Sequence, residues 1–320
     1  RSLWLIDDLT VLHQLSDDLA KSEFHLYKPM PSYRMGGFQN KNAITKEGLN
    51  HPGGVMTHFY LKEKPLDSVE VKLMYYQADG KLIREFSTKA KEEADKLPEL
   101  KKGGNLFAWN MRYPDAKKFD GMILWAGGVG GPRAAPGSYL VKLMVGKTAQ
   151  EQAFEILKDP RAESTQAELQ QQFDFLIAVR DKVSETHQAI IDIRSIREQL
   201  NQFKTKVKGD DSLKALAAQA TGIDSVLTLV ENELYQTKNK SGQDPLNYPI
   251  RLNNKLAHVG STVGFGDYPP TRQAIQVKEE ITMKIDIQLA IFRKIVADQL
   301  PEFNKAVKAR EIDAVVLKKE

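Results

Sequence analysis

Adjacent carboxylates are the first residues in this sequence that could do chemistry, because glycosidic-bond hydrolysis uses two Asp or Glu side chains around one bond. Neighbours in sequence point to opposite sides of a strand and lie about 100° apart on a helix, so adjacency alone does not aim two carboxylates at one bond. We interpret most pairs as helix caps and solvated residues, and retain only Asp7 and Asp8 as candidate catalytic residues. The pairs are Asp7-Asp8, Asp17-Asp18, Glu92-Glu93, Asp210-Asp211 and Glu279-Glu280.

Metal and cofactor chemistry has little support in the sequence. There are no cysteines, and the six histidines are scattered without an H-E-x-x-H pattern or a His pair spaced i, i+4. His187 lies between Val183 and Ile190 on a predicted helix, which favours a buried structural histidine over a ligand. We expect neither a metal nor a cofactor.

Three aromatic residues are candidates for stacking on a sugar ring: Trp125, Tyr113 and Trp109. Trp109 alternates with Phe107 and Met111 in an apolar strand, so core packing is favoured for it. Trp125 precedes a glycine run and is the better candidate for an exposed ring.

Two further patterns fail as functional motifs. The run Gly127–Pro132 lacks the Lys-Ser/Thr of a phosphate-binding loop and is interpreted as a flexible loop between strands. Lys101-Lys102 and Lys117-Lys118 are short basic pairs without regularly interleaved aromatic residues, so nucleic acid is not an expected partner.

The elements that would position these residues change type near the middle of the chain. Residues 1–158 contain 15 of the 21 glycines and 17 of the 26 aromatic residues, and all three tryptophans. Short apolar runs with Gly and Pro between them predict strands, and Asp79-Gly80 predicts a type I′ hairpin turn with both residues at positive φ. The predicted strands are Val55–Leu61, Val69–Tyr75, Lys81–Ser87, Leu106–Met111, Ser138–Val145 and about Ala149–Leu157.

The second half predicts four amphipathic helices, because apolar residues recur there at steps of three and four. Ser164 and Thr165 are available as caps for the first helix, and Pro301 is expected to begin a terminal turn or short helix. The predicted helices span Gln166–Val207, Asp211 to about Gln236, Tyr248–Val263, and Pro270 to about Gln299.

These elements predict a multidomain β plus α protein: an immunoglobulin-like β-sandwich followed by an antiparallel helical bundle. The predicted boundaries give a connector at 1–52, the sandwich at 53–158 and a four-helix bundle-like domain at 159–320. The net charge of +4 describes a near balance, and no apolar run approaches 18 residues, so a membrane span is not expected.

The first 52 residues are less regular. Leu3–Ile6 predicts an isolated strand without a local partner, and Lys41–Gly54 predicts a mobile loop. The chain begins without Met or a signal peptide, which leads us to expect a processed product or a fragment.

An ordered series of segments resembles the C-terminal region of bacterial sortilin-like BNR/Asp-box propeller proteins labelled glycosyl hydrolases. The resemblance covers nearly the whole chain and implies an exported protein with a large β-propeller upstream. In this resemblance, residues 1–8 correspond to the strand that closes the propeller. The Asp-box repeat S-x-D-x-G-x-x-W is absent from this sequence. The segments are RSLWLIDDL (1–9), HLYKP (25–29), NLFAWNMRYP (105–114), GPRAAPGSYLVKL (131–143) and KDPRAESTQAEL (158–169).

Three functions follow as hypotheses. The leading one is a non-catalytic accessory region that supports the propeller or binds protein or glycan, so the chain alone is not expected to be an enzyme. The second is a glycoside hydrolase-like enzyme whose cleft is shared with the missing propeller, with Asp7 or Asp8 at its edge. The third is a carbohydrate-binding module.

Overall fold

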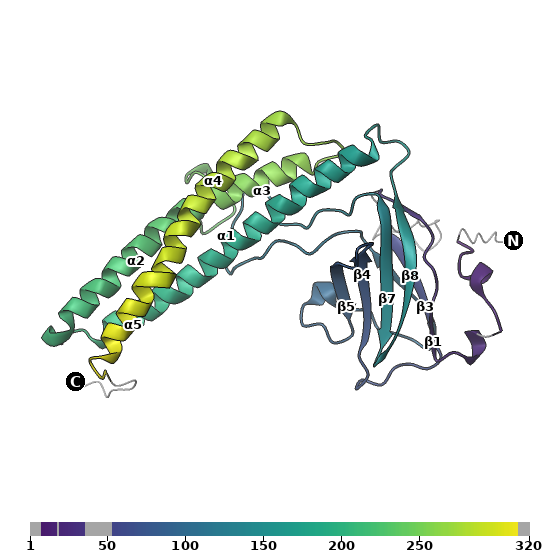
Figure 1. Ribbon diagram of the computed structural model, residues 1–320, viewed down its shortest axis with the longest axis horizontal. Helices are drawn as coiled ribbons and strands as arrows, with labels where there is room; N and C mark the ends of the chain where they lie inside the picture. Colours follow the sequence, from purple (N-terminus) through teal and green to yellow (C-terminus); the bar gives the residue numbers. More distant parts are fainter. Residues whose placement is uncertain (1–7, 18, 36–52, 313–320) are drawn as a thin grey trace. The chain divides into compact units, whose positions relative to one another are not determined.

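The chain folds as an N-terminal β region followed by a C-terminal four-helix region, as predicted (Figure 1). A computed structural model describes residues 8–17, 19–35 and 53–312. The predicted strand Leu3–Ile6, the candidate Asp7 and most of the predicted loop Lys41–Gly54 lie outside the described residues.

The β region consists of two sheets, one of them curled into a half-barrel. The first sheet is antiparallel and has the order β1-β3-β6, formed by β1 (Phe24–Leu26), β3 (Val55–Leu61) and β6 (Gly103–Trp109). The second has the order β2-β8-β7-β4-β5, formed by β2 (Ser32–Tyr33), β4 (Val71–Gln77), β5 (Leu82–Ser87), β7 (Gly137–Val145) and β8 (Thr148–Leu157). Only the β2–β8 pairing is parallel among these strands.

Aromatic side chains join the two sheets face to face. Trp109 of β6 is fully buried and stacks on Tyr75 of β4, with ring centroids 4.5 Å apart. The Tyr75 hydroxyl and Thr57 Oγ1 on β3 form a buried hydrogen bond of 2.7 Å. The core prediction for Trp109 is confirmed, because the ring lies between the sheets and has no exposed surface.

β6 ends two residues earlier than predicted. The expected strand reached Met111, whereas the observed one ends at Trp109. Met111 has φ of +60°, outside the extended region that a strand requires, so it turns the chain out of the sheet.

The hairpin between β4 and β5 is tight but is not a type I′ turn. Of the residues in this turn, only Gly80 has positive φ, at +85°, so the expectation for Asp79 is wrong. Gly80 N donates to Gln77 O at 2.9 Å, and Gln77 N donates to Lys81 O at 2.9 Å. This pattern is typical of a type I turn followed by a left-handed glycine, the usual three-residue hairpin.

The helical region contains α1 (Gln166–Lys206), α2 (Lys214–Leu234), α3 (Leu252–Val263) and α4 (Arg272–Lys294). Thr165 begins α1 with a capping box: Glu168 N donates to Thr165 Oγ1 at 3.2 Å, and Thr165 N donates to Glu168 Oε2 at 2.7 Å. A core of Leu, Ile, Val and Phe side chains joins the helices, including the fully buried Ile190, Leu227 and Ile285.

Pro301 lies in the first turn of a short terminal helix, as predicted, but no break separates that helix from α4. A π-helical segment, Ile295–Gln299, leads directly into α5 (Leu300–Lys308). Pro301 has no N–H to donate to the carbonyl four residues earlier, and a widened turn accommodates that missing bond without breaking the helix.

The chain divides into two compact units, and their limits differ from the predicted boundary between residues 158 and 159. The β unit contains Arg1–Pro114, Gly131–Phe173 and Asp267–Pro269. The helical unit contains Asp115–Gly130, Asp174–Gly266 and Pro270–Glu320. Residues 115–130, which the sequence assigns to the β domain, therefore belong to the helical unit, and the first turns of α1 belong to the β unit.

Within the described residues, Asp211–Leu234 is long and apolar enough to cross a membrane by length and composition, although no continuous apolar run is present. One face of this helix packs into the helical core through residues such as Leu216, Ile223 and Leu234. Such packing is typical of a core helix in a compact unit.

Candidate functional site

The outer face of the three-stranded sheet gathers aromatic and apolar side chains. Burial alternates along β3, where His58 and Tyr60 are half-buried between fully buried neighbours, so both point away from the core. His58 lies opposite Leu106 of β6, and Tyr60 lies opposite His25 of β1. Leu106 is 46% exposed on this face.

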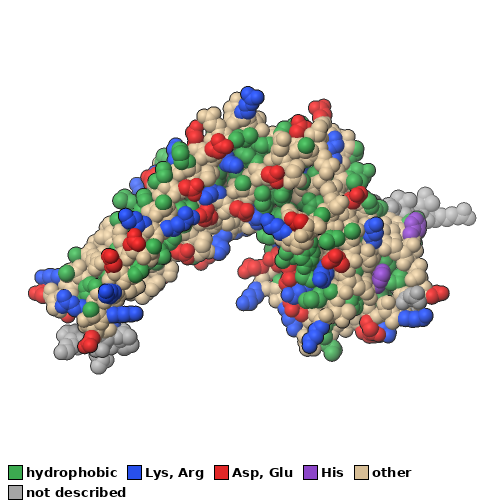
Figure 2. Space-filling view, viewed as in Figure 1, with side chains coloured by type: hydrophobic (Ala, Val, Ile, Leu, Met, Phe, Trp, Pro, Cys, Tyr) green, Lys and Arg blue, Asp and Glu red, His purple; other side chains and the backbone are tan. Residues whose placement is uncertain are grey.

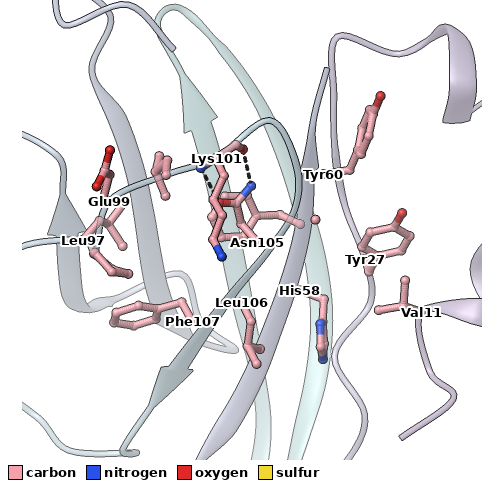
Figure 3. Close-up of a pocket in the computed structure, with 14 residues that line it drawn as sticks. Val11, Tyr27, His58, Tyr60, Leu97, Glu99, Lys101, Asn105, Leu106 and Phe107 are labelled. Carbon is pink, nitrogen blue, oxygen red and sulfur yellow. Dashed lines mark hydrogen bonds between the residues drawn. The ribbon is translucent and has the colours of Figure 1, made fainter. Parts of the chain in front are cut away.

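A groove of about 570 Å³ lies beside these residues (Figure 3). Its lining combines aromatic, aliphatic and charged side chains. Asn105 fixes one rim, because its Nδ2 donates to Lys101 O at 2.8 Å and its Oδ1 accepts from Lys101 N at 2.9 Å. The side chains labelled in Figure 3 are Val11, Tyr27, His58, Tyr60, Leu97, Glu99, Lys101, Asn105, Leu106 and Phe107.

The candidate catalytic residue Asp8 lies near this face, next to His58. Asp8 Oδ2 is 3.4 Å from His58 Nε2, and Asp8 Oδ1 accepts a hydrogen bond from Thr10 N at 2.8 Å. Burial alone would raise the pKa of Asp8, but the hydrogen bonds with Thr10 and the neighbouring His58 outweigh it and lower the pKa. Asp8 is therefore an ionised, hydrogen-bonded carboxylate, which is suited to orienting a histidine. His58 is the residue that sequence reasoning missed, since pairing between β1, β3 and β6 places it on this face.

The aromatic candidates Trp109 and Tyr113 offer no face to a ligand. Trp109 has no exposed surface and Tyr113 is 5% exposed. Gln77 Nε2 donates to the Tyr113 hydroxyl at 2.7 Å. Both residues belong to the β unit, whereas Trp125 belongs to the helical unit and is 37% exposed.

Trp125 lies in residues 115–130, here called the strap. From the sequence, part of the strap is expected to be a flexible loop. The structure instead fixes the strap on the helices. Asn254 of α3 binds both main-chain polar groups of Trp125: Oδ1 accepts from Trp125 N at 2.7 Å and Nδ2 donates to Trp125 O at 2.8 Å. One and two turns further along α3, His258 binds Ala126 O at 2.6 Å and Ser261 Oγ accepts from Gly128 N at 2.9 Å.

Glycine at position 127 lets the strap approach α3 closely. A Cβ there would lie 3.0 Å from His258 N and 3.1 Å from Asn254 Nδ2. Tyr235 at the end of α2 holds the preceding stretch, because its hydroxyl accepts from Ile123 N at 3.0 Å and donates to Gly121 O at 3.2 Å. The glycine run therefore serves close backbone packing at this point.

His187 is a buried structural histidine, as predicted. It has no exposed surface, and its Nδ1 contacts Lys117 O of the strap. Asn253 Nδ2 lies 3.1 Å from His187 Nε2. Since a carbonyl only accepts, Nδ1 carries the proton and Nε2 accepts from Asn253, which is the neutral tautomer. Burial lowers the pKa of His187, although its bond to Lys117 opposes this shift.

The described residues contain no group of three or more His, Asp or Glu side chains that could hold a metal ion. Acidic and basic side chains are interspersed over the face shown in Figure 2, without a large region of one sign.

Comparisons with known proteins give no family. No protein-family model matches the chain, and no curated protein matches it. Among solved structures the chain is similar to pT26-6p at 15% identity and a TM-score of 0.17, covering 84% of this chain. The chain spans about half of that protein, 49% of its length.

Proposed function

We propose that this chain is a non-catalytic interaction region and that its β unit binds a protein or glycan partner through the outer face of the β1-β3-β6 sheet. The observation that carries the proposal is the groove of about 570 Å³ beside Tyr60, His58 and the exposed Leu106. Concave sites that combine apolar and aromatic walls with a few polar groups are typical of ligand-binding sites.

The proposal also covers the fold type of the two units and the protein to which this chain belongs. The two face-to-face sheets support an immunoglobulin-like sandwich, and the four helices support an antiparallel bundle. The resemblance to bacterial sortilin-like propeller proteins suggests an exported protein with an upstream β-propeller as the intramolecular partner. Determining the reading frame upstream of Arg1 tests whether a β-propeller precedes this chain. Asp-box repeats in that frame would support the proposal, and a frame without them would refute it.

Binding is tested with the purified full chain on a glycan array and against the recombinant upstream domain. Tyr60→Ala and Leu106→Ser should each weaken binding without lowering the melting temperature of the β unit, because both side chains face outward. Tyr33→Ala is the matched control, since Tyr33 is 50% exposed on β2 of the other sheet. Equal losses in all three variants, or no loss in Tyr60→Ala and Leu106→Ser, would refute the groove as the binding site.

A glycoside hydrolase-like enzyme is the second candidate, favoured by the Asp8–His58 contact at 3.4 Å. A carboxylate that orients a histidine is a common arrangement for general base catalysis. We expect no turnover of aryl glycosides or polysaccharides by the chain alone. Turnover that is lost in Asp8→Asn and in His58→Gln would replace the leading proposal with this one.

A carbohydrate-binding module is the third candidate, favoured by the 37% exposure of Trp125. Stacking on this ring predicts glycan binding that is lost in Trp125→Ala and kept in Trp109→Phe, because only the exposed ring can contact a sugar. Glycan binding that survives Trp125→Ala would exclude this site.

A further inference from the structure

Two arginines lie side by side on a short ladder in the β unit. Arg112 and Arg133 are antiparallel bridge partners. The flanking hydrogen bonds run from Tyr113 N to Pro132 O at 3.0 Å and from Ala134 N to Met111 O at 2.7 Å. This pattern makes Arg112 and Arg133 a non-hydrogen-bonded pair, in which the Cα atoms lie about 4.5 Å apart and both side chains leave the same face.

The ladder is held rigidly. A Cβ on Gly131 would lie 1.9 Å from Tyr113 O, so only glycine permits this approach of the two segments. Met111 holds a φ of +60°, a conformation that costs free energy in a residue other than glycine and that clusters at functional sites.

A third arginine is fixed beside the pair. Arg34 is only 4% exposed, and its Nε donates to Ala134 O at 3.0 Å, next to Arg133 in the chain. Its Nη2 donates to Gln172 Oε1 at 3.1 Å, and its Nη1 forms an ion pair with Asp267. These three partners and the arginine itself belong to the β unit.

Asp267 is paired with Arg34, so its charge does not offset the positive charges of Arg112 and Arg133. Arg112 donates one hydrogen bond, from Nη1 to Gly131 O at 2.8 Å. The guanidinium of Arg133 makes no hydrogen bond or ion pair with any described residue, although Arg133 is half-buried. Burial lowers the pKa of Arg133, and the charges of Arg34 and Arg112 lower it further, against an opposing effect of Asp267. Like charges directly opposite on neighbouring strands are destabilising.

We propose that Arg112 and Arg133 form a binding site for an oxyanion, a phosphate group or a carboxylate, with the Arg34–Asp267 ion pair beside it. Guanidinium groups bind both kinds of oxyanion through paired N–H donors, and none of the guanidinium donors of Arg133 is bonded to a described residue. A bound oxyanion places negative charge between the two guanidiniums and removes their repulsion. This site is independent of the groove on the outer face of the β1-β3-β6 sheet.

The test is a titration of the purified full chain with inorganic phosphate and, separately, with glucuronate, at constant ionic strength. Binding is followed through the arginine Nε–H signals in nitrogen-15 NMR spectra. We expect saturable shifts at millimolar concentrations, and binding at least about tenfold weaker in Arg133→Gln and in Arg112→Gln. Arg272→Gln is the control for net charge, because Arg272 is exposed at the start of α4.

Each result has a defined meaning. Phosphate binding without glucuronate binding identifies a phosphate site, and the reverse identifies a carboxylate site. Arg133→Lys keeps the charge but loses the paired donors, so binding between that of the wild type and Arg133→Gln supports recognition by the guanidinium pair. Absence of saturable binding by either ion, or an equal loss in Arg272→Gln, would overturn the proposal. Unchanged melting curves in the variants exclude loss of the fold as the cause.

Discussion

The polar side chains around the strap of the helical unit differ in what they bind from those at the candidate sites of the β unit. In the helical unit, Asn254, Tyr235 and His187 direct hydrogen bonds to the main chain of the strap. In the β unit, the guanidinium of Arg133 makes no hydrogen bond or ion pair with a described residue, and Tyr60 and His58 face outward beside a groove. Polar side chains bonded to main chain mark structural positions in the first unit, whereas outward-facing ones mark candidate binding positions in the second.

Because of this difference, substitutions can test stability and binding separately. Replacing a strap-binding residue should destabilise the helical unit, because it leaves partly buried backbone groups without partners. Replacing an outward-facing residue of the β unit should affect binding and leave stability nearly unchanged. Four predictions test the contrast, beginning with the largest expected effect.

Gly131→Ala should destabilise the β unit by at least about 3 kcal/mol, because the new Cβ would lie 1.9 Å from Tyr113 O and the backbone must separate. Chemical denaturation followed by tryptophan fluorescence measures this change, since Trp109 lies in the β core. Gly130→Ala is the matched control, because a Cβ at Gly130 meets nothing within 4 Å. Equal effects of the two substitutions would show that the ladder is not constrained as described.

Asn254→Ala should destabilise the helical unit by about 2 kcal/mol, because Trp125 N and O both lose their partner in a partly buried position. Thermal unfolding followed by circular dichroism at 222 nm, the helix signal, measures the loss. Asn304→Ala on the exposed side of α5 serves as control and should change stability little. A wild-type melting curve for Asn254→Ala would mean that the strap does not contribute to the helical core.

Lowering the pH should reduce the stability of the helical unit, because His187 is buried there in its neutral form. Its pKa in the folded state is below the ordinary 6.5, so the unfolded chain takes up a proton first as the pH falls. The contribution to stability is complete above pH 6.5 and is lost as the pH falls toward the folded-state pKa, by up to about 1.4 kcal/mol per pH unit.

Denaturant unfolding of the helical unit between neutral pH and about pH 5 measures this slope. His187→Gln should be less stable at neutral pH and show a shallower slope. Nitrogen-15 NMR of the imidazole should show the proton on Nδ1. A proton on Nε2, or titration of His187 above pH 6.5, would contradict the assignment.

Arg133→Gln should leave the β unit as stable as the wild type or raise its stability by about 0.5 kcal/mol, because it removes the repulsion from Arg112. The gain should shrink as salt is added, since salt screens partly exposed charges. Denaturant titrations at low and high ionic strength measure it. A loss above about 1 kcal/mol would mean that Arg133 is a structural residue, and the contrast between the units would fail at this position.

Local sequence patterns predicted most of the regular elements. β3 has the predicted bounds Val55–Leu61, and α1 ends within one residue of the prediction. Alternation with period two and apolar steps of three and four depend only on residues close in the chain, so they can be seen without the fold. The cap at Thr165 and the buried state of His187 could be anticipated for the same reason.

Local patterns failed where a distant segment determined the conformation. The strap was interpreted as part of the β domain because it is rich in glycine, yet Asn254, more than 100 residues later, binds its main chain. This outcome does not follow from the residues next to the strap.

The sequence by itself therefore determined the order of β and helical regions, the main strands and helices, and the core role of Trp109 and His187. Only the tertiary structure brought Asp8 to His58, paired Arg112 with Arg133, and placed Tyr60 and Leu106 beside one groove. The physical reason is that hydrophobic periodicity records which side of an element is buried, whereas strand pairing and chain crossings decide which outward-facing side chains become neighbours.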